Sequence, residues 1–425
     1  MRYTYEGWYD EVRPRQGSDQ AIRDYLREEE KYYSALLPEA LDLMKGMADG
    51  AKNDLDQSRH SEAMSNFEKI LMINSYYELL LHAPACSGAV ILGTATKDGK
   101  TIHVSSEDQH FFPQEYLVTF IASPSDPHAH RITVTDTAGE IGSEHAMNDR
   151  GVTVSGYAGG FARIAEPTPA SPFSGYRRPG LDWQVGDFYA AAFGGSAKDA
   201  VQLLTVGRPD YRAKSGKKIV IGKCARGVNW LVSDAKEAYV VESIPADENG
   251  VARYAIRKPG DLSEKNASFI VSTNNVEANY SCDENNDCNQ SHPMSLHGHF
   301  SLPPTPHFEL NTEGMRFWTL TWLIRNNYGE ITPEMVKVWR TAHFIYDEAG
   351  VKHENISIDG KTVPANLVPD AATLCWHSSG PPGVETNKGV DTYVSISTPD
   401  DLTVARTRGR PCEWVGPWDT ITLRP

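Results

Sequence analysis

The stretch that decides the fold is HAPACSGAVILGTATKDGKTIHVSSED, residues 82–108. It contains two short runs of β-forming residues, SGAVILG and KTIHVSS, and the Asp98–Gly99 pair between them is a strong signal for a hairpin turn. One cysteine, Cys86, stands directly before the first run. The stretch therefore predicts a β-hairpin that begins a sheet, with a thiol at its head.

The chain before this hairpin, residues 18–81, is expected to be helical. SDQAIRDYLREEEKYYSALL begins at a capping residue, Ser18 or Asp19, and PEALDLMKGMADGAK begins at Pro38, which suits a first helical turn. SNFEKILMINSYYELLL is a third amphipathic segment. Core packing explains the apolar stripes of all three segments, so they indicate no cofactor site.

The chain after the hairpin is rich in predicted strands. They are expected in RITVTDTAGEIG, GVTVSGYAGG, VNWLVSDAKEAYVVE and ASFIVSTNN, and the C-terminal VDTYVSISTPDDLTVARTRGRPCEWVGPWDTITL predicts two or three more. Helices are expected in DFYAAAFGGSAKDAVQLL and, capped by Thr332, in ITPEMVKVWRTAHFIYDE. Runs of strands with separate pairs of helices predict an α+β fold.

Composition excludes several classes of function. A net charge of −15 over 425 residues argues against nucleic-acid binding, which depends on basic contacts to phosphate. No apolar run reaches the roughly 20 residues that span a bilayer, and no glycine-rich phosphate loop is present. No signal peptide is visible, which favours a cytoplasmic location but leaves a secreted or vesicular one, with the signal removed, open. Nothing indicates an oligomeric state.

Cysteine and histidine spacing gives no metal signature. Cys282 and Cys288 bracket the acidic loop CDENNDC, and they form either a small-loop disulfide or two surface thiols. They lack the CxxC pairs of a zinc site. The histidines of SHPMSLHGHFSLPPTPH fit a substrate-lining or surface loop better than a metal site; they are His292, His297, His299 and His307. No metal and no cofactor is therefore expected.

Cys86 has two interpretations from the residues alone. A cysteine outside a disulfide is often a small buried hydrophobe, but its thiol is also the most nucleophilic ordinary side chain near neutral pH. If the bond between Ala85 and Cys86 were cleaved, Cys86 would gain an α-amine with a pKa of about 7.7–8.0. That amine could serve the thiol as its base. Without cleavage, His377 would be the candidate for a Cys–His dyad.

Several motifs resemble, in order, a family of autoproteolytic acyltransferases and hydrolases that includes fungal isopenicillin N acyltransferase. They are LDLMKGMADGAK, LMINSYYELL, CSGAVILGTATKDGKTIH, MNDRGVTVS, WLVSDAKEAYVVE, STNN, GEITPEMVKVWRTAHF, TLCWHSSG and GRPCEW. That family belongs to the N-terminal-nucleophile hydrolases, with choloylglycine hydrolase and penicillin V acylase as relatives and phospholipase-B-like proteins as more distant kin. The similarity is patchy but colinear from about residue 36 to residue 420.

The resemblance implies a four-layer αββα sandwich of two antiparallel sheets with a helical N-terminal segment. It implies autocleavage between Ala85 and Cys86, after which the helical segment 1–85 stays associated with the domain 86–425. Cys86 would then attack an amide or thioester carbonyl of a small acylated substrate and form an acyl-enzyme. Water or an amine acceptor would release the acyl group.

The resemblance also implies roles for other residues. Asn274 in VSTNNV matches the residue that stabilises the oxyanion, with Asn275 as the fallback, although a turn-forming Asn would fit the same motif. Asp108 falls where relatives hold the nucleophile's amine, and a solvated acid is the alternative. Arg316 falls where relatives carry an active-site arginine, and a salt bridge at a helix start is the alternative.

Two expected site positions depart from the family pattern. Ser105 stands where many relatives carry arginine, and Ala158 stands where the bile-salt-hydrolase branch carries a second oxyanion asparagine. A backbone N–H near Ala158 or Gly159 would have to supply that donor. Ser87 and Gly88 are expected to leave room for a substrate carbonyl because both are small.

Two alternatives to an amidohydrolase or acyltransferase remain open. A phospholipase-B-like lipid amidase or esterase is favoured by the Ser105–Ser106 pair, and a non-catalytic binding protein is favoured by the missing polar groups at 105 and 158. The pocket loops are expected in 109–130, 160–185 and 276–310. Their aromatic residues suggest an apolar acyl group, and Arg177 or Arg178 could meet a substrate carboxylate.

Overall fold

The computed structural model describes most of the chain, from the N-terminus to near the C-terminus. The described residues are 1–80, 86–109, 116–142, 144–158, 182–207, 227–244, 253–261, 267–274, 278–282, 288–293, 312–358, 361–365, 373–375, 390–414 and 417–423.

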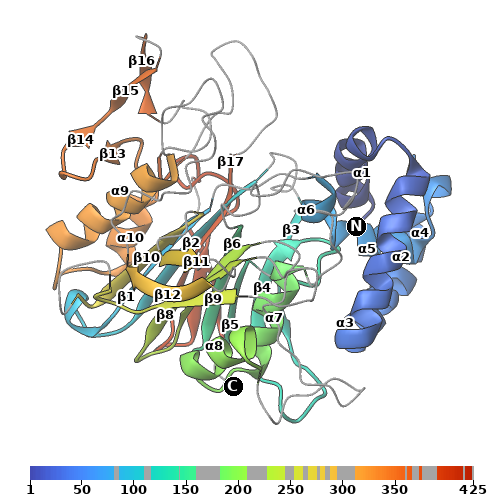
Figure 1. Cartoon of the computed structure of the whole chain (residues 1–425), viewed down its shortest axis with the longest axis horizontal. Helices are drawn as coiled ribbons and strands as arrows, with labels where there is room; N and C mark the ends of the chain where they lie inside the picture. Colours follow the sequence, from blue (N-terminus) through green and yellow to red (C-terminus); the bar gives the residue numbers. More distant parts are fainter. Residues whose placement is uncertain are drawn as a thin grey trace.

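Two antiparallel sheets form the body of the described structure (Figure 1). The first has the order β10-β1-β2-β17-β18-β19, made of β1 (Ser87–Ile91), β2 (Ile102–Gln109), β10 (Phe269–Thr273), β17 (Val390–Thr398), β18 (Thr403–Arg406) and β19 (Asp419–Thr422). The second follows chain order and is made of β3 (Leu117–Ala122), β4 (Ile132–Thr137), β5 (His145–Asn148), β6 (Thr153–Ala158), β7 (Val228–Ser233), β8 (Ala238–Ile244) and β9 (Arg253–Arg257). Hairpin β1–β2 is the one that Asp98–Gly99 predicts, and β7–β8 is a second hairpin within the stretch VNWLVSDAKEAYVVE.

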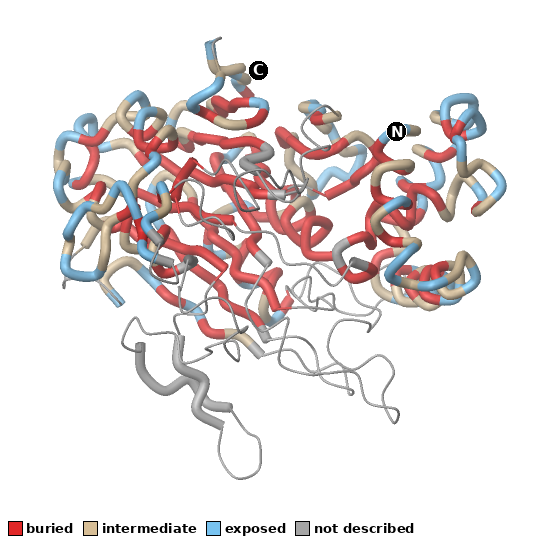
Figure 2. Tube along the Cα trace, turned by 90° about the horizontal axis from the view of Figure 1, so that it is seen from above, coloured by how far each residue is buried: buried red, intermediate tan, exposed pale blue. Residues whose placement is uncertain are grey.

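Helices cover the outer face of each sheet. α9 (Thr312–Asn326) and α10 (Pro333–Trp339) pack Phe317 and Val336 against Ala89 and Ile102 of the first sheet. α7 (Trp183–Phe193) and α8 (Ala197–Thr205) pack on the second sheet (Figure 1). The layers therefore run helix, sheet, sheet, helix, and the predicted αββα sandwich is confirmed by the chain's own strands and helices. Figure 2 shows buried residues running through both sheets.

The space between the sheets contains a polar chain that ties them together. His103 of β2 lies 2.8 Å from Ser233 Oγ and 3.0 Å from Ser155 Oγ, both on the second sheet. His145 of β5 lies 2.8 Å from Ser155 Oγ and 2.6 Å from Ser397 Oγ on the first sheet. Burial lowers the pKa of His103, and it lowers the pKa of His145 to about 3. Both imidazoles are therefore neutral links at neutral pH.

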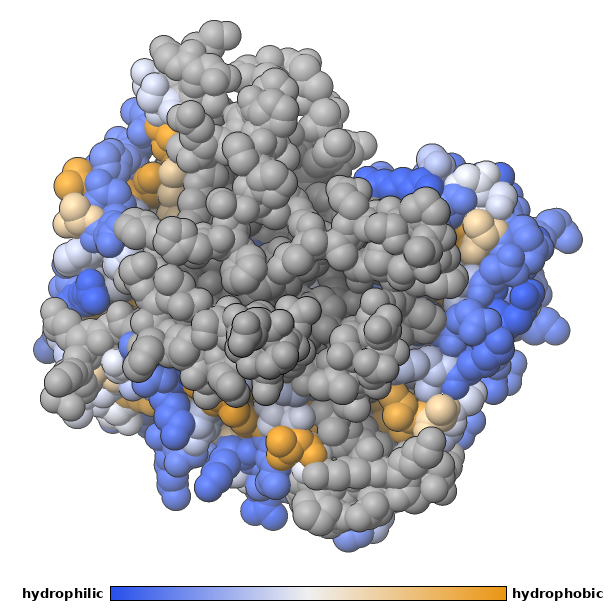
Figure 3. Space-filling model, viewed as in Figure 1, coloured by the Kyte–Doolittle hydropathy of each residue, from blue (hydrophilic) through white to orange (hydrophobic). Residues whose placement is uncertain are grey.

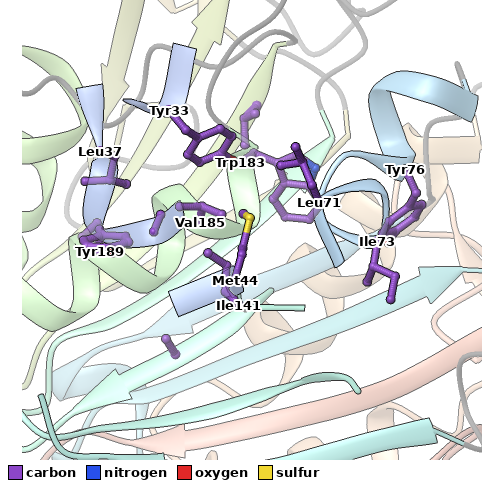
Figure 4. Close-up of a cluster of buried hydrophobic side chains, with 14 of the residues drawn as sticks. Tyr33, Leu37, Met44, Leu71, Ile73, Tyr76, Ile141, Trp183, Val185 and Tyr189 are labelled. Atoms are coloured by element: carbon purple, nitrogen blue, oxygen red, sulfur yellow. The ribbon is translucent and has the colours of Figure 1, made fainter. Parts of the chain in front are cut away.

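The N-terminal 80 residues form helices that pack on α7. They are α1 (Arg2–Gln16), α2 (Asp19–Leu36), α3 (Pro38–Gly50), α4 (Lys52–Leu55), α5 (Asn66–Ile73) and α6 (Tyr76–Leu80), with a 3-10 turn at Ser61–Ala63. Figure 4 shows Met44 and Leu71 from this segment beside Trp183 and Val185 of α7. The outer surface of these helices, at the right of Figure 3, is mostly hydrophilic. They form a layer that is amphipathic and shares its core with the sandwich.

Local signals in the sequence set most of the helix starts. Ser18 Oγ accepts from the N–H of Ala21, Pro38 opens α3, and Thr332 Oγ1 accepts from the N–H of Met335, as predicted. The residue pattern did not predict α1, which lies in the N-terminal segment that the resemblance implies to be helical. The predicted single helix after residue 65 is wrong because it breaks at Asn74, whose buried amide donates to the carbonyl of Gly139 and accepts from the N–H of Ile141.

Three small hairpins complete the described elements. They are β11 (Ala278–Cys282) with β12 (Cys288–Pro293), β13 (Ile345–Tyr346) with β14 (Lys352–His353), and β15 (Asn355–Ile358) with β16 (Lys361–Pro364). The register places Cys282 opposite Cys288. Their disulfide stays a prediction. Among the described residues, no helix has the length and apolar character that crossing a membrane requires.

Candidate active site

Cys86 stands at the start of the central part of the first sheet. It directly precedes β1, which lies between β10 and β2. Its side chain is fully buried between the two sheets, where it clusters with Val90, Tyr157, Leu231 and Ile270. The thiol therefore points into the interior of the sandwich, toward the second sheet.

Strand register brings Asn274 to the backbone of Cys86. β10 runs antiparallel to β1 with Thr273 opposite Ser87, so the next residue of β10's chain meets the residue before β1. The N–H of Cys86 donates to Asn274 Oδ1 at 2.6 Å, across 188 residues of sequence. Asn274 Oδ1 also accepts from Arg316 Nη2 at 3.1 Å. Two donors thus fix the oxygen end of this carboxamide, and with it the direction of the Nδ2 donor.

Arg316 joins Asn274 to Asp108. Its Nη1 lies 3.3 Å from Asp108 Oδ2, and both side chains are almost completely buried. Asp108 belongs to β2 and Arg316 to α9, so the pair links the first sheet to the helix that covers it. Cys86, Asn274, Arg316 and Asp108 form one connected chain of polar contacts. Arg316 was expected to be either an active-site residue or a partner in a salt bridge. The structure has both features, because Arg316 pairs with Asp108 and also donates to Asn274, which holds Cys86.

The surroundings hold the thiol of Cys86 in its neutral form. Burial raises the pKa of Cys86 well above its ordinary value, and the negative charges of Glu144 and Asp108 raise it further. A hydrogen bond from the backbone of Asp108 and the positive charge of Arg316 act in the opposite direction but do not offset the burial. As the uncut chain is folded, Cys86 is therefore a protonated thiol.

The expected room beside Gly88 is filled by protein atoms. A Cβ on Gly88 would overlap the hydroxyl of Tyr157 and the carbonyl of Val104. Tyr157 Oη in turn donates to Ser105 Oγ at 3.2 Å, and Ser105 is the cross-strand partner of Gly88. The prediction that Gly88 makes space for a substrate carbonyl is wrong, since its small size admits Tyr157.

Ser87 faces the opposite side of the sheet from Cys86. Successive side chains of a strand alternate between faces, and Ser87 Oγ lies 3.2 Å from Ser106 Oγ. The buried Arg340, at the end of α10, donates to Ser87 Oγ at 3.1 Å. The prediction that Ser87 leaves room for a substrate is therefore also wrong, because its hydroxyl anchors the sheet to α10.

The structure describes the other predicted site positions only in part. Ala158 ends β6 opposite Val228, and the structure describes its backbone but not its side chain. His292 lies in β12, again without a described side chain. The remaining candidates lie outside the described residues: Ala85, Gly159, Arg177, Arg178, Asn275, His297, His299, His307 and His377.

Sequence reasoning missed the neighbours that the stacking of sheets and helices creates. Tyr157 comes from the facing sheet, Arg340 from the end of α10, and Glu144 from the chain before β5. Only the alternation of side chains along GVTVSGYAGG carries a usable signal. Val154 packs toward the helix layer, so Tyr157, three residues later, must lie on the opposite face of the strand, between the sheets. A second missed feature is a set of buried carboxyls whose pKa burial raises: Glu107, Asp136, Glu140, Asp182 and Asp187.

No family model matches this sequence, and no curated protein matches it. Among solved structures, the chain is similar to the Caenorhabditis elegans ortholog of N-acylethanolamine-hydrolyzing acid amidase, at 9% identity and TM-score 0.39 over 74% of this chain and 93% of that one. A variant of the conjugated bile acid hydrolase from Clostridium perfringens is 12% identical, with TM-score 0.40 over 80% and 92%. Penicillin V acylase from Agrobacterium tumefaciens is 12% identical, with TM-score 0.38 over 80% and 86%. All three likenesses are remote.

Proposed function

We propose that the protein is a self-processing cysteine amidohydrolase or acyltransferase in which Cys86 becomes the first residue of the mature domain. The observation that carries this proposal is the 2.6 Å hydrogen bond from the backbone nitrogen of Cys86 to Asn274 Oδ1. A side chain that holds this nitrogen in the uncut chain would hold the same nitrogen as an α-amine after cleavage. Arg316 and Asp108 fix that side chain from behind.

Processing would use the thiol against the peptide bond before it. Cys86 Sγ loses its proton and attacks the carbonyl carbon of Ala85, the carbon–nitrogen bond breaks, and the nitrogen of Cys86 takes up the proton that the thiol lost and becomes an amine. Water then hydrolyses the Ala85 thioester, which releases a carboxylate and restores the thiol. The step makes an amine with a pKa of about 7.7–8.0 directly beside the sulfur.

Turnover would repeat the same chemistry on a substrate. The amine accepts the thiol proton as Sγ attacks an acyl carbonyl, and it returns the proton to the leaving group. Asn274 Nδ2 donates to the oxyanion of the tetrahedral intermediate, a contribution of about 2.7–4 kcal/mol for comparable donors. Water or an amine acceptor then attacks the thioester and releases the acyl group.

Cleavage would also supply the base that the nucleophile lacks in the uncut chain. In the uncut chain Cys86 is fully buried and its thiol is neutral. Cleavage would place an α-amine, a base, directly beside this thiol. The buried, inactive thiol thus fits a precursor that becomes competent only after it has cut itself.

Variants of Cys86 test the proposal. We expect the wild-type protein to appear as two polypeptides and Cys86→Ala as one uncut chain of 47.0 kDa without turnover. Cys86→Ser, which preserves size, should cut slowly, and this separates loss of the nucleophile from loss of packing. Thermal unfolding of each variant shows that it is folded. Processing of Cys86→Ala at the same bond would refute the proposal.

Substrate assays separate the proposed amidase from the lipid alternative. N-acyl amino acids should be turned over by the processed protein, whereas lysophospholipids would be preferred by a phospholipase-B-like enzyme. A folded, uncut wild-type chain whose Cys86 does not react with iodoacetamide would instead identify a binding protein that retains the sandwich.

A further inference from the structure

Three metal-binding side chains meet on the side of the first sheet away from Cys86. His343 lies between α10 and β13, Cys375 lies in the segment 373–375, and Cys412 lies in the turn after β18. Their ligand atoms all lie within 4.8 Å of one another. We propose that His343, Cys375 and Cys412 bind a zinc ion that clamps these three segments together.

The donor set fits zinc rather than a hard cation. Thiolate and imidazole ligands favour zinc and related soft metals, whereas magnesium and calcium select oxygen ligands. Zinc binds sulfur at about 2.3 Å and histidine nitrogen at about 2.0–2.1 Å in a tetrahedron. With these bond lengths, the two sulfurs and the nitrogen of a tetrahedral site lie about 3.6–3.8 Å apart, so a contraction of the observed cluster would complete three corners. The fourth corner would take water.

Backbone contacts hold these segments in place. The N–H of Cys375 donates to the carbonyl of Ala342, the neighbour of His343, at 3.2 Å. Thr373 Oγ1 donates to the carbonyl of Cys375 at 2.7 Å. The turn that carries Cys412 is closed by the N–H of Glu413, which donates to the carbonyl of Arg410 at 3.1 Å. Because the bond between Cys375 and Ala342 needs no metal, the segments of Cys375 and His343 are held side by side before an ion arrives.

A disulfide between the two cysteines is the competing arrangement. The structure holds Cys375 and Cys412 as separate thiols, and a disulfide would give His343 no part in the cluster. A metal explains why all three donors converge. The sequence predicts no metal here because the ligands come from distant segments and none forms a short-spaced pair.

The site would act on the candidate active site through Arg340. This residue directly follows α10, three positions before His343, and its Nη1 donates to Ser87 Oγ, the residue next to Cys86. A zinc ion that fixes the chain at His343 would therefore steady the anchor behind β1. We expect the metal to contribute to stability, because metal binding energy in such sites is folding energy.

Metal content of the full chain tests the site. Protein expressed with added zinc and then desalted should contain about one zinc per chain, as measured by inductively coupled plasma mass spectrometry. Cys86→Ala should retain the zinc, since it removes a thiol outside the site. His343→Gln and Cys412→Ser alter exposed positions and should fold but lose the zinc. A chelator should lower the unfolding midpoint of wild type and Cys86→Ala, and leave that of Cys412→Ser unchanged.

Two results would overturn the inference. One is folded wild-type protein without zinc that takes up none when zinc is added. The other is a peptide pair joined through Cys375 and Cys412, two hydrogens lighter than the thiol forms, which would establish a disulfide instead. Both readouts are independent of turnover, so they stand whether or not Cys86 is a nucleophile.

Discussion

Arg316 is a buried cation held between a carboxylate and a carboxamide. Asp108 balances its charge, and Asn274 uses the other end of the guanidinium to orient its oxygen toward Cys86. The planar fork of arginine suits this double contact, which a lysine ammonium cannot reproduce. The candidate site is therefore a small electrostatic unit whose members depend on one another.

Arg316→Met should destabilise the protein by about 3–5 kcal/mol, because it leaves Asp108 buried without its counter-charge. Urea unfolding measures this loss. The double variant Asp108→Asn with Arg316→Met should be more stable than Arg316→Met alone, since the uncompensated charge is gone. If the double variant were instead as unstable as the sum of the two single changes, the ion pair would not be coupled.

Cys86, Asp108, Asn274 and Arg316 were all predicted from the sequence as candidate site residues. In the structure these four residues contact one another. Cys86 stands before a predicted hairpin, whereas Asp108, Asn274 and Arg316 were singled out by their match to the family that the motifs resemble. Tyr157 and Arg340 were missed because their nearness to β1 depends on how sheets and helices stack. Strand alternation in GVTVSGYAGG indicates on which face of its strand Tyr157 lies, but the spacing of residues does not show that β1 and β6 face each other or that Arg340 lies behind β1.

Strand β1 is covered on both of its faces. Ala89 and Ile91 face α9 and α10, whereas Val90 lies between the sheets. A strand buried on both faces shows no alternation of polar and apolar residues. The sequence therefore predicted the hairpin but gave the wrong environment for Ser87 and Gly88. For the same reason it could not tell which way the thiol of Cys86 points.

Gly88→Ala should destabilise the protein by about 1–3 kcal/mol or more, because the added methyl group overpacks against Tyr157 and Val104. Gly46→Ala is the matched control, since a Cβ there meets nothing within 4 Å. Gly46 lies inside α3, where alanine should stabilise by about 0.5–1 kcal/mol. Denaturant midpoints of both variants measure the contrast. Equal stability of Gly88→Ala and wild type would show that β1 and β6 pack differently.

The N-terminal helices and the sandwich share one hydrophobic core. Tyr33, Met44 and Leu71 from the first 80 residues pack with Trp183 and Tyr189 of α7 (Figure 4). Apolar burial of this kind contributes roughly 1.5–3 kcal/mol for each large side chain. The proposed boundary at 85/86 is thus a break in the chain that leaves the core intact.

A processed protein should therefore remain one particle. The segments 1–85 and 86–425 should co-elute in size-exclusion chromatography and separate only in denaturant, because the contacts between them are buried and apolar. Elution of the small segment on its own under native conditions would contradict this packing. An alternative cut in an exposed loop is distinguished by the masses of the two polypeptides.

Buried titratable groups make the stability of the whole molecule depend on pH. Burial raises the pKa of five carboxyls, and that of Asp136 reaches about 6; the others are Glu107, Glu140, Asp182 and Asp187. Their ordinary pKa values are about 3.9–4.3, so above this range the folded state holds more protons. Stability is then lost as the pH rises toward the folded pKa values.

The two buried histidines change the pH dependence of stability in the opposite direction, and they act only below about pH 6.5. His103 and His145 have folded pKa values below the ordinary value of about 6.5. The folded protein therefore loses the stability that these neutral side chains contribute as the pH falls below that value. Below this pH the effect of five carboxyls on the free energy of unfolding is larger than the opposite effect of two histidines. Above this pH only the carboxyls change the stability. We expect the thermal unfolding midpoint to fall from about pH 5 to about pH 8.

Thermal unfolding across this range checks the direction, and Glu107→Gln supplies the control. Removing one carboxyl whose pKa is raised should make the decline shallower. A midpoint that rises steadily toward pH 8 would show that these carboxyls are ionised and compensated in the folded protein.

Terminal sequencing of the purified protein is the most direct test of the proposal that Cys86 begins a polypeptide. Besides the N-terminus of the helical segment, we predict a second sequence that reads Cys-Ser-Gly-Ala-Val, beginning at Cys86. Active protein that yields only the sequence beginning at Met1 would contradict it.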